Sequence, residues 1–338
     1  MSETAPGPQK HGLKIAVGIL LSLVFLGLAF YNINFRQLLE IFRRLNPWWI
    51  VLVSLLSPWG WYFRARVWKQ LIGQRAQPSM WNLFRIITIG YMLNNLLPLK
   101  IGEVVRAWLL GKRENLPTSL AIGTVVVERL LDVLTLLTYF AFTMIFIPFA
   151  PWLKLSGVVV GAIGLGMLVL VLITYRYGER FTVWLEKPFY RLPGNTGPWL
   201  HSQLAKFLEG LRLIDKPSQL FKAFFWCLIT WMVWIVIGYM TFLAFGLNLP
   251  FLAAIFLMVV LNFGLMIPSS PGGLGVYEFM VILSLTPYGV GKEAALGVAF
   301  FSHIVPYLVN VVFGWIFAMQ MNLSMGKMYS ESEQLKVE

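Results

Sequence analysis

The segment LNFGLMIPSSPGGLGVYE at residues 261–278 interrupts an apolar stretch that covers residues 251–290. Two prolines and three glycines fall within eight positions, from Pro268 to Gly275. Proline lacks the N–H that a helix interior requires, and glycine readily adopts non-helical backbone. A continuous helix is therefore excluded, and the pattern predicts two shorter helices separated by a break.

A second apolar stretch, residues 81–112, is broken by GYMLNNLLPLKIGEVVR at residues 90–106. Pro98 disrupts the helix, and the polar pair Glu103 and Arg106 follows three residues apart, so both share one helical face. Charged side chains and irregular backbone at membrane depth are tolerated where they face a cavity, water or each other. We therefore expect this break to carry function as well.

The two breaks resemble each other, because each contains Leu-Asn, then proline, then glycine, then glutamate. Paired breaks that enter the membrane from opposite sides are typical of inverted-repeat transporters, whose sites lie near the bilayer midplane. The match is short, so an inverted repeat and two unrelated breaks both remain open. Exposed helix N-termini at such breaks offer N–H groups to an anion such as a lipid phosphate.

The composition places these breaks in a membrane protein. Of the 338 residues, 58% are hydrophobic and 12% are charged, whereas soluble domains have roughly 45–50% and about 25%. The excess falls into runs of about 20 residues, the length of helix that crosses a bilayer. The predicted fold is an all-α polytopic membrane protein with about six spanning helices and two re-entrant helical hairpins. The spans are predicted at residues 13–31, 48–63, 119–148, 154–175, 221–245 and 294–320.

Lysine and arginine counts orient the predicted spans. If both broken stretches enter and leave on the same side, 21 of the 27 Lys and Arg residues lie in inner segments and five in outer segments. Basic residues are in excess in cytoplasmic loops, so both termini are expected in the cytoplasm. If each broken stretch crossed once, the basic segment 176–222 would lie outside. The count therefore favours two hairpins that enter from opposite sides.

The predicted organisation is one membrane domain, residues 13–320, between polar tails at residues 1–12 and 321–338. The first apolar run is long and no small-residue cleavage site ends it, so an uncleaved span is expected rather than a signal peptide. Amphipathic segments are predicted at residues 35–45, in the membrane interface, and at residues 176–220.

A third polar feature is VVVERLLD at residues 125–132, within an otherwise apolar span. Glu128, Arg129 and Asp132 lie within a 100° arc of a helix and face one direction. In one interpretation, Arg129 pairs with Glu128 or Asp132 and pins neighbouring helices. In the other, Arg129 binds an anionic headgroup or a carboxylate exchanges protons. Both interpretations remain open.

Other sites and partners have weaker support. The net charge of +12 fits basic loops beside anionic headgroups, and no basic–aromatic module typical of nucleic-acid binding is present. One cysteine, Cys227, excludes a disulfide or a Cys-based metal site within the chain. Three widely spaced histidines argue against a His-based metal site, and no cofactor motif appears. Arg64 and Arg66 end a predicted span and are expected to reach toward headgroups. His303 is expected to be packed and hydrogen-bonded rather than to relay protons.

Three segments together resemble the membrane, flippase-like domain of the lysylphosphatidylglycerol synthase family. They are NNLLPLKIGEVVR at 94–106, VVVERLLD at 125–132 and IPSSPGGLGVYE at 267–278, and with the hydrophobic spacing the resemblance covers residues 15–320. It implies a multi-pass protein of the bacterial or archaeal cytoplasmic membrane that handles phospholipid or polyprenyl-linked substrates. Full-length synthases add a soluble aminoacyltransferase domain, which we do not expect in this chain.

The leading hypothesis is a lipid flippase for an anionic phospholipid or a polyprenyl phosphate, without enzymatic activity. In this hypothesis, Arg106 and Arg129 bind the phosphate. The acidic residues Glu103, Glu278 and Asp132 set the headgroup preference or couple protons to transport. One alternative is a membrane subunit that holds lipid for a separately encoded transferase, and a homo-oligomer is also open. The alternative ranked last is a polyprenyl-phosphate-dependent glycosyltransferase, with Glu103 or Asp132 as base. The candidate substrate-binding residues are Asn94, Asn95, Pro98, Glu103, Arg106, Glu128, Arg129, Asp132, Asn262, Pro268, Gly272, Gly273 and Glu278.

Overall fold

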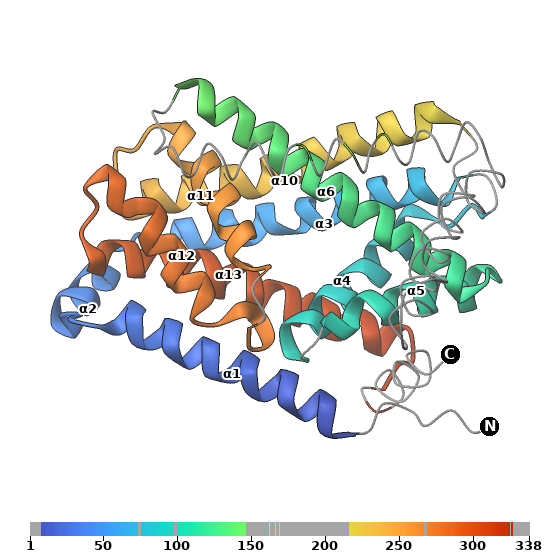
Figure 1. Ribbon diagram of the computed structural model, residues 1–338, viewed down its shortest axis with the longest axis horizontal. Coiled ribbons are helices and arrows are strands. Elements are labelled where there is room, and N and C mark those ends of the chain that lie inside the picture. Colours follow the sequence, from blue (N-terminus) through green and yellow to red (C-terminus); the bar gives the residue numbers. More distant parts are fainter. Residues whose placement is uncertain are drawn as a thin grey trace, which may run out of the picture. The chain divides into compact units, whose positions relative to one another are not determined.

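The computed structural model is built from α-helices (Figure 1). No β-strand occurs among the residues that it describes, so the predicted all-α class is confirmed. The described residues are 8–73, 76–97, 100–146, 216–266 and 269–324, with the single positions 162, 166, 169 and 326.

Helices occur at five of the six predicted spans. The sixth, 154–175, and most of the amphipathic segment 176–220 lie outside the described ranges. The helices are α1 (Pro8–Phe30), α2 (Phe35–Arg43), α3 (Trp48–Ile72), α4 (Met80–Leu96), α5 (Ile101–Glu114), α6 (Thr118–Phe146), α10 (Pro217–Ala244), α11 (Phe251–Gly264), α12 (Val276–Leu285) and α13 (Lys292–Gln320). Two short 3-10 turns, η3 (Pro271–Gly273) and η4 (Thr286–Tyr288), flank α12.

By length and composition, α10 and α13 can each cross a bilayer, through Ser218–Ala244 and Lys292–Gln320. A third candidate among the described residues is the pair Val17–Phe30 and Phe35–Arg43, whose helices meet at 83°. The second member of this pair is α2, the short amphipathic helix that the sequence predicts. The full number of spans and the side from which each break enters the membrane stay predictions.

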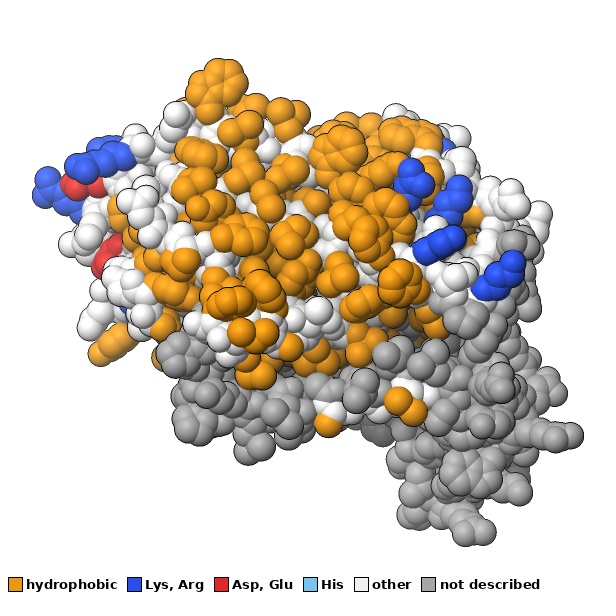
Figure 2. Space-filling view, turned by 90° about the horizontal axis from the view of Figure 1, so that it is seen from above, with side chains coloured by type: hydrophobic (Ala, Val, Ile, Leu, Met, Phe, Trp, Pro, Cys, Tyr) orange, Lys and Arg blue, Asp and Glu red, His pale blue; other side chains and the backbone are white. Residues whose placement is uncertain are grey.

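Large apolar side chains are exposed on several helices. Leu20 and Leu23 on α1, and Leu308, Val312 and Met319 on α13, are each about half exposed or more. Figure 2 shows a face on which hydrophobic side chains gather over a broad area, with Lys and Arg toward its margins. Soluble monomers rarely expose apolar patches larger than a few hundred Å². This surface therefore agrees with a protein that is surrounded by lipid.

The chain forms two compact units, each assembled from separate stretches. The first unit is Met1–Gly60, Thr88–Gly102 and Met232–Glu338, and the second is Trp61–Ile87 and Glu103–Trp231. Helices α3, α4, α5 and α10 therefore each contribute residues to both units.

In the first unit, α12 packs against α1, α11 and α13 (Figure 1). Phe25 of α1 contacts Phe279 of α12 with ring centroids 5.2 Å apart. Asn34 caps α2 by accepting a hydrogen bond from the Gln37 N–H at 3.2 Å, and its own N–H donates to Glu293 at the start of α13. These contacts fix the sharp bend between α1 and α2.

The second unit has an apolar core formed by α3, α6 and α10. Its fully or nearly fully buried members include Val67, Leu71, Val127, Leu131 and Cys227. The only cysteine of the chain therefore lies inside this core, and its thiol becomes reactive toward an added reagent only when the unit opens.

The first predicted break is present between α4 and α5. At its end, a Cβ on Gly102 would lie 1.8 Å from the Gly90 carbonyl oxygen, so only glycine allows this approach of α5 to α4. Lys100, just before α5, has a φ of 52° in the left-handed region. The chain therefore folds back on itself here, whereas Pro98 lies outside the described residues.

The second predicted break is present between α11 and α12. Gly272, Gly273 and Gly275 have φ values of 71°, 74° and 86°, which glycine adopts without the strain of a side chain. The break packs on α1, because a Cβ on Gly275 would lie 2.3 Å from the Ser22 carbonyl oxygen, and the Ser270 N–H donates to the Ser22 hydroxyl at 2.7 Å. Pro268 lies outside the described residues.

The substitution Gly102→Ala is expected to lower the free energy of unfolding by about 1–3 kcal/mol, because the added methyl overlaps a backbone oxygen that cannot move freely. Thermal unfolding in detergent, followed by the loss of helical circular dichroism, measures this change. Gly27→Ala is the matched control, since a Cβ there meets no atom within 4 Å. Equal unfolding temperatures for the two variants would contradict the close approach.

Candidate functional site

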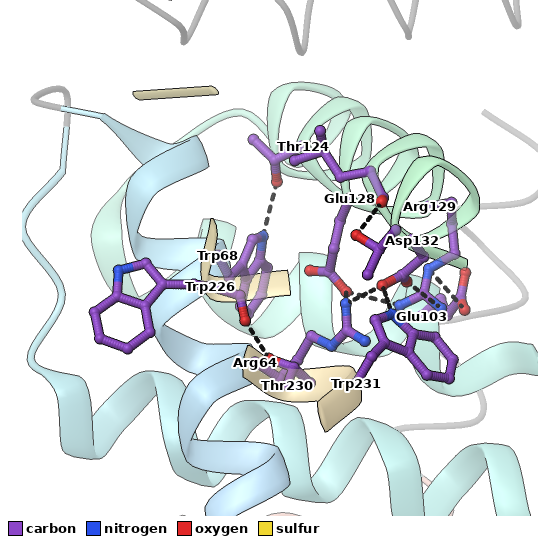
Figure 3. A network of polar contacts seen from close by, with 12 residues as sticks. Arg64, Trp68, Glu103, Thr124, Glu128, Arg129, Asp132, Trp226, Thr230 and Trp231 are labelled. Carbon is purple, nitrogen blue, oxygen red and sulfur yellow. Dashed lines mark hydrogen bonds and ion pairs between the residues drawn. The ribbon is translucent and has the colours of Figure 1, made fainter. Parts of the chain in front are cut away.

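Six charged side chains meet in the second unit (Figure 3). They come from three helices, and we call them the charge cluster: Arg64, Glu103, Arg106, Glu128, Arg129 and Asp132. Five of the six, all except Arg64, are among the substrate-binding residues that the sequence predicts. Helical spacing brings them together, because Glu103 and Arg106 are three residues apart on α5, and Glu128 and Asp132 are four apart on α6.

Glu128 is the centre of the charge cluster and its side chain is 0% exposed. Arg106 donates to both carboxylate oxygens, with Nη1 3.2 Å from Oε2 and Nη2 3.0 Å from Oε1. Arg129 donates to Oε1 at 2.7 Å, and Arg64 lies 3.6 Å from the same oxygen. One buried carboxylate thus contacts three guanidinium groups, and the bidentate bond from Arg106 fixes its orientation.

Asp132 is the second buried acid of the cluster. Arg64 Nη1 donates to its Oδ1 at 2.6 Å, and the indole N–H of Trp231 on α10 donates to the same oxygen at 2.9 Å. Arg129 Nη1 lies 3.2 Å from Oδ2. Asp132 therefore ties α3 and α10 to α6, as in the helix-pinning interpretation.

Aromatic rings lie against two of the three arginines. The Arg106 guanidinium lies 5.1 Å from the centroid of Trp68, and the Trp68 indole N–H donates to the Thr124 hydroxyl at 2.8 Å. The Arg64 guanidinium lies 5.9 Å from Trp231. Cation–π contacts of this kind stabilise a desolvated guanidinium.

Two members of the cluster are partly exposed. Arg129 and Glu103 have 39% and 23% of their side chains exposed, whereas the other four members have 7% or less. The ion pair between Arg129 Nε and Glu103 Oε1 is also long, at 3.6 Å. A ligand would therefore reach the cluster at Arg129 and Glu103.

The expectation that Arg64 reaches toward headgroups is wrong. Its side chain is 3% exposed and paired with Asp132. The reason is that α3 does not end near residue 63 but continues to Ile72, so Arg64 lies in the interior of the helix. Arg64 and Trp68 lie one turn apart on one face of α3, a signal that could have placed both side chains against the charge cluster.

In the first unit, His303 of α13 contacts the second break at Gly272 and the first turn of α12 at Glu278. Its Nε2 lies 2.9 Å from the Gly272 carbonyl oxygen, and its Nδ1 lies 2.8 Å from Glu278 Oε1. Glu278 is fully buried and its Oε2 accepts the Gly275 N–H at 2.6 Å. The carbonyl can only accept, so Nε2 carries a proton. The contact between Nδ1 and Oε1 then holds one further proton, which either partner can carry.

The ring of His303 is packed as expected. It stacks on Tyr277 with centroids 4.1 Å apart, and the Tyr277 hydroxyl donates to Ser302 at 3.1 Å. Every polar atom of the imidazole is therefore used within the fold of the break.

The asparagines of the first break have separate surroundings. Asn95 donates to Asn310 of α13 at 3.0 Å, and Asn310 donates to the Thr88 carbonyl oxygen at 3.3 Å. Asn310 was not a candidate, although a single amide in an apolar helix is a signal that sequence reasoning can use. The Asn94 side-chain oxygen is buried without a hydrogen-bond partner among the described residues. Among the described contacts, Asn262 donates to Met258 of its own helix.

Replacing Glu128 by Gln is expected to destabilise the protein by about 3–5 kcal/mol, because three buried guanidinium groups lose their shared counter-charge. Glu103→Gln, at the exposed edge, is expected to cost about 1 kcal/mol or less. Unfolding followed through Cys227 compares the two. If Glu103→Gln lowers the free energy of unfolding as much as Glu128→Gln does, Glu103 is not the partly exposed residue described here.

Replacing His303 by Ala is expected to increase hydrogen–deuterium exchange in residues 269–275, because the Gly272 carbonyl and the Glu278 carboxylate both lose a partner. Glu278→Gln is the informative companion, since its amide can donate to Nδ1 while its oxygen still accepts the Gly275 N–H. We expect near-native exchange in that variant. Equal exchange in the native protein and the Ala variant would refute the bridging role of His303.

Comparisons with known proteins identify relatives of this chain that are membrane proteins. The sequence matches the family described as "Lysylphosphatidylglycerol synthase TM region" over residues 15–314. A UPF0104 membrane protein of Methanocaldococcus jannaschii is 23% identical, over 90% of this chain and 94% of the relative. A UPF0104 membrane protein of Methanothermobacter thermautotrophicus is 24% identical, over 88% and 92% of the two chains.

A third relative, the glycosyltransferase AglD of Haloferax volcanii, is 22% identical over 95% of this chain but only 57% of its own length. No solved structure matches the chain. Because the family match extends over residues 15–314, this protein belongs to the lysylphosphatidylglycerol synthase transmembrane family.

Proposed function

We propose that this membrane protein is a flippase that moves a phospholipid or a polyprenyl-linked lipid between the two leaflets. The observation that carries the proposal is the partial exposure of Arg129 in an otherwise buried charge cluster. Charged side chains in membrane segments are costly and usually mark a substrate or ion path. A guanidinium with exposed surface is the preferred partner of a lipid phosphate.

The contacts indicate different roles for Arg106 and Arg129. Arg106 is buried and bidentate to Glu128, so we assign it to positioning the cluster rather than to phosphate binding. Arg129 then contacts the phosphate, while the acyl or prenyl chains stay in the bilayer. In the first unit, the Glu278–His303 pair offers a proton-holding contact beside the second break, which supports proton coupling as the role of Glu278.

The family supports a lipid substrate, because its description names a lipid synthase whose membrane region matches this chain. We do not carry over aminoacyl transfer, since only the membrane region matches. The anionic substrate and the cytoplasmic location of both termini remain expectations of the same proposal.

AglD favours one second candidate, a glycosyltransferase that uses a polyprenyl-phosphate donor. The chain covers little more than half of AglD, so the name supports this activity only for the longer protein. Sugar transfer from a polyprenyl-phosphate donor to a lipid acceptor by the purified protein would favour it over lipid movement. A membrane subunit that holds lipid for a separate transferase is instead recognised by stable co-purification with that enzyme.

Purified protein in liposomes is expected to move a fluorescent phospholipid or polyprenyl phosphate to the outer leaflet faster than empty vesicles do. Arg129→Gln is expected to slow this movement by about ten-fold or more, because a hydrogen bond to a charged group contributes roughly 1.5–3 kcal/mol. Quenching of the label by dithionite measures the rate. Arg36→Gln is the control, since Arg36 is 90% exposed and pairs only with Glu40 at 3.5 Å in the described contacts.

A native protein that moves none of these lipids overturns the proposal, and so does an Arg129 variant that equals the Arg36 control. Arg129→Lys keeps the charge and guards against a folding defect. Partial activity is expected for it, because lysine cannot reproduce the bidentate geometry of arginine.

A further inference from the structure

The formal charges of the cluster cancel. It contains three guanidinium groups, from Arg64, Arg106 and Arg129, and three carboxylates, from Glu103, Glu128 and Asp132. Each carboxylate has a guanidinium nitrogen within 3.6 Å, an arrangement that keeps both partners charged. A ligand therefore meets a site that is neutral before it arrives.

A neutral site responds differently to an anionic and to a zwitterionic headgroup. A lone phosphate that binds Arg129 takes the place of Glu103 and leaves this carboxylate without its partner. The site then carries an excess negative charge in a medium of low dielectric constant, which is unfavourable. A headgroup that also carries an ammonium group supplies Glu103 with a new partner, and the balance of charge is kept.

The geometry agrees with an exchange of partners at this ion pair. Glu103 and Arg129 are the two exposed members of the cluster, and their 3.6 Å separation is longer than the 2.6–3.2 Å of most other pairs. Arg129 also keeps contacts with Glu128 and Asp132 when Glu103 is displaced. The Arg129 guanidinium thus keeps its position while its exposed edge binds a new anion.

We infer that Arg129 and Glu103 form a paired subsite for a zwitterionic phospholipid headgroup, in which Arg129 binds the phosphate and Glu103 binds the ammonium group. This inference rests on the proposed lipid movement and replaces the anionic phospholipid with a phosphoethanolamine-type headgroup. Glu103 is the residue that determines headgroup preference, because its charge alone distinguishes the two classes of lipid at the open edge.

The test compares two lipids that carry the fluorophore on an acyl chain, so that both headgroups stay natural. One is phosphatidylethanolamine, which is zwitterionic, and the other is phosphatidylglycerol, which is anionic. In native protein, the zwitterionic lipid is expected to move about three- to five-fold faster, since an ion pair at a partly exposed position contributes up to about 1 kcal/mol. In Glu103→Gln the cluster has one excess positive charge, so the ratio of the two rates is expected to fall to about one or below.

Two further variants separate charge from folding. Glu103→Asp keeps the charge and is expected to retain the native preference. Glu40→Gln removes a carboxylate from the exposed pair on α2, outside the cluster, and is expected to leave the ratio unchanged. Unfolding followed through Cys227 checks that each variant is folded.

Equal movement of the two lipids by native protein, or a ratio that Glu103→Gln leaves unchanged, overturns the inference while lipid movement itself stands. If native protein moves neither lipid but moves a polyprenyl phosphate, the inference also fails and the flippase remains. If none of the three moves, the proposed function fails, and this result is distinct from the first two.

Discussion

The second unit depends on the burial of one carboxylate, Glu128, among three arginines. An ion that leaves water loses several kcal/mol of solvation, and only close pairing compensates this loss. Because the arginines come from α3, α5 and α6, any rotation or sliding of one helix separates a charge from its partner. Apolar helices in lipid lack a strong hydrophobic drive to associate in one register. The buried ions therefore supply the specificity that the apolar surfaces of these helices cannot.

The first unit reaches its specificity by other means. Its breaks are held by close backbone approaches at glycine and by hydrogen bonds to backbone groups, as at Gly102, Gly275 and the Gly272 carbonyl. Its buried acid, Glu278, is satisfied by one imidazole and one N–H instead of by arginine. The two units thus bury carboxylates with different partners: permanently charged guanidinium groups in one, and in the other a side chain that can give up its proton.

The sequence predicted the helices and breaks well because both depend on local properties. Apolar run length defined α10 and α13, and the cluster of proline and glycine located the break before α12. Helical spacing also predicted that Glu128, Arg129 and Asp132 face one direction. What spacing could not provide was the partner from another helix. Arg64 was placed at a span end because α3 runs past its apolar part, and Asn310 was missed because its partner, Asn95, lies 215 residues earlier. Whether these residues bind lipid stays a prediction, since contacts within a protein do not identify a ligand.

The packing of the second break on α1 has a consequence for the order of folding during synthesis. Ser22 and Ser270 are 248 residues apart, yet they share a hydrogen bond, and the Gly275 backbone packs on the same turn of α1. At ribosomal rates of about 5–20 residues per second, α1 is made roughly 12–50 s before the segment that it supports. The first helix must therefore already be formed when the second break is made, and the break takes its place on α1 only after Gly275 has been synthesised.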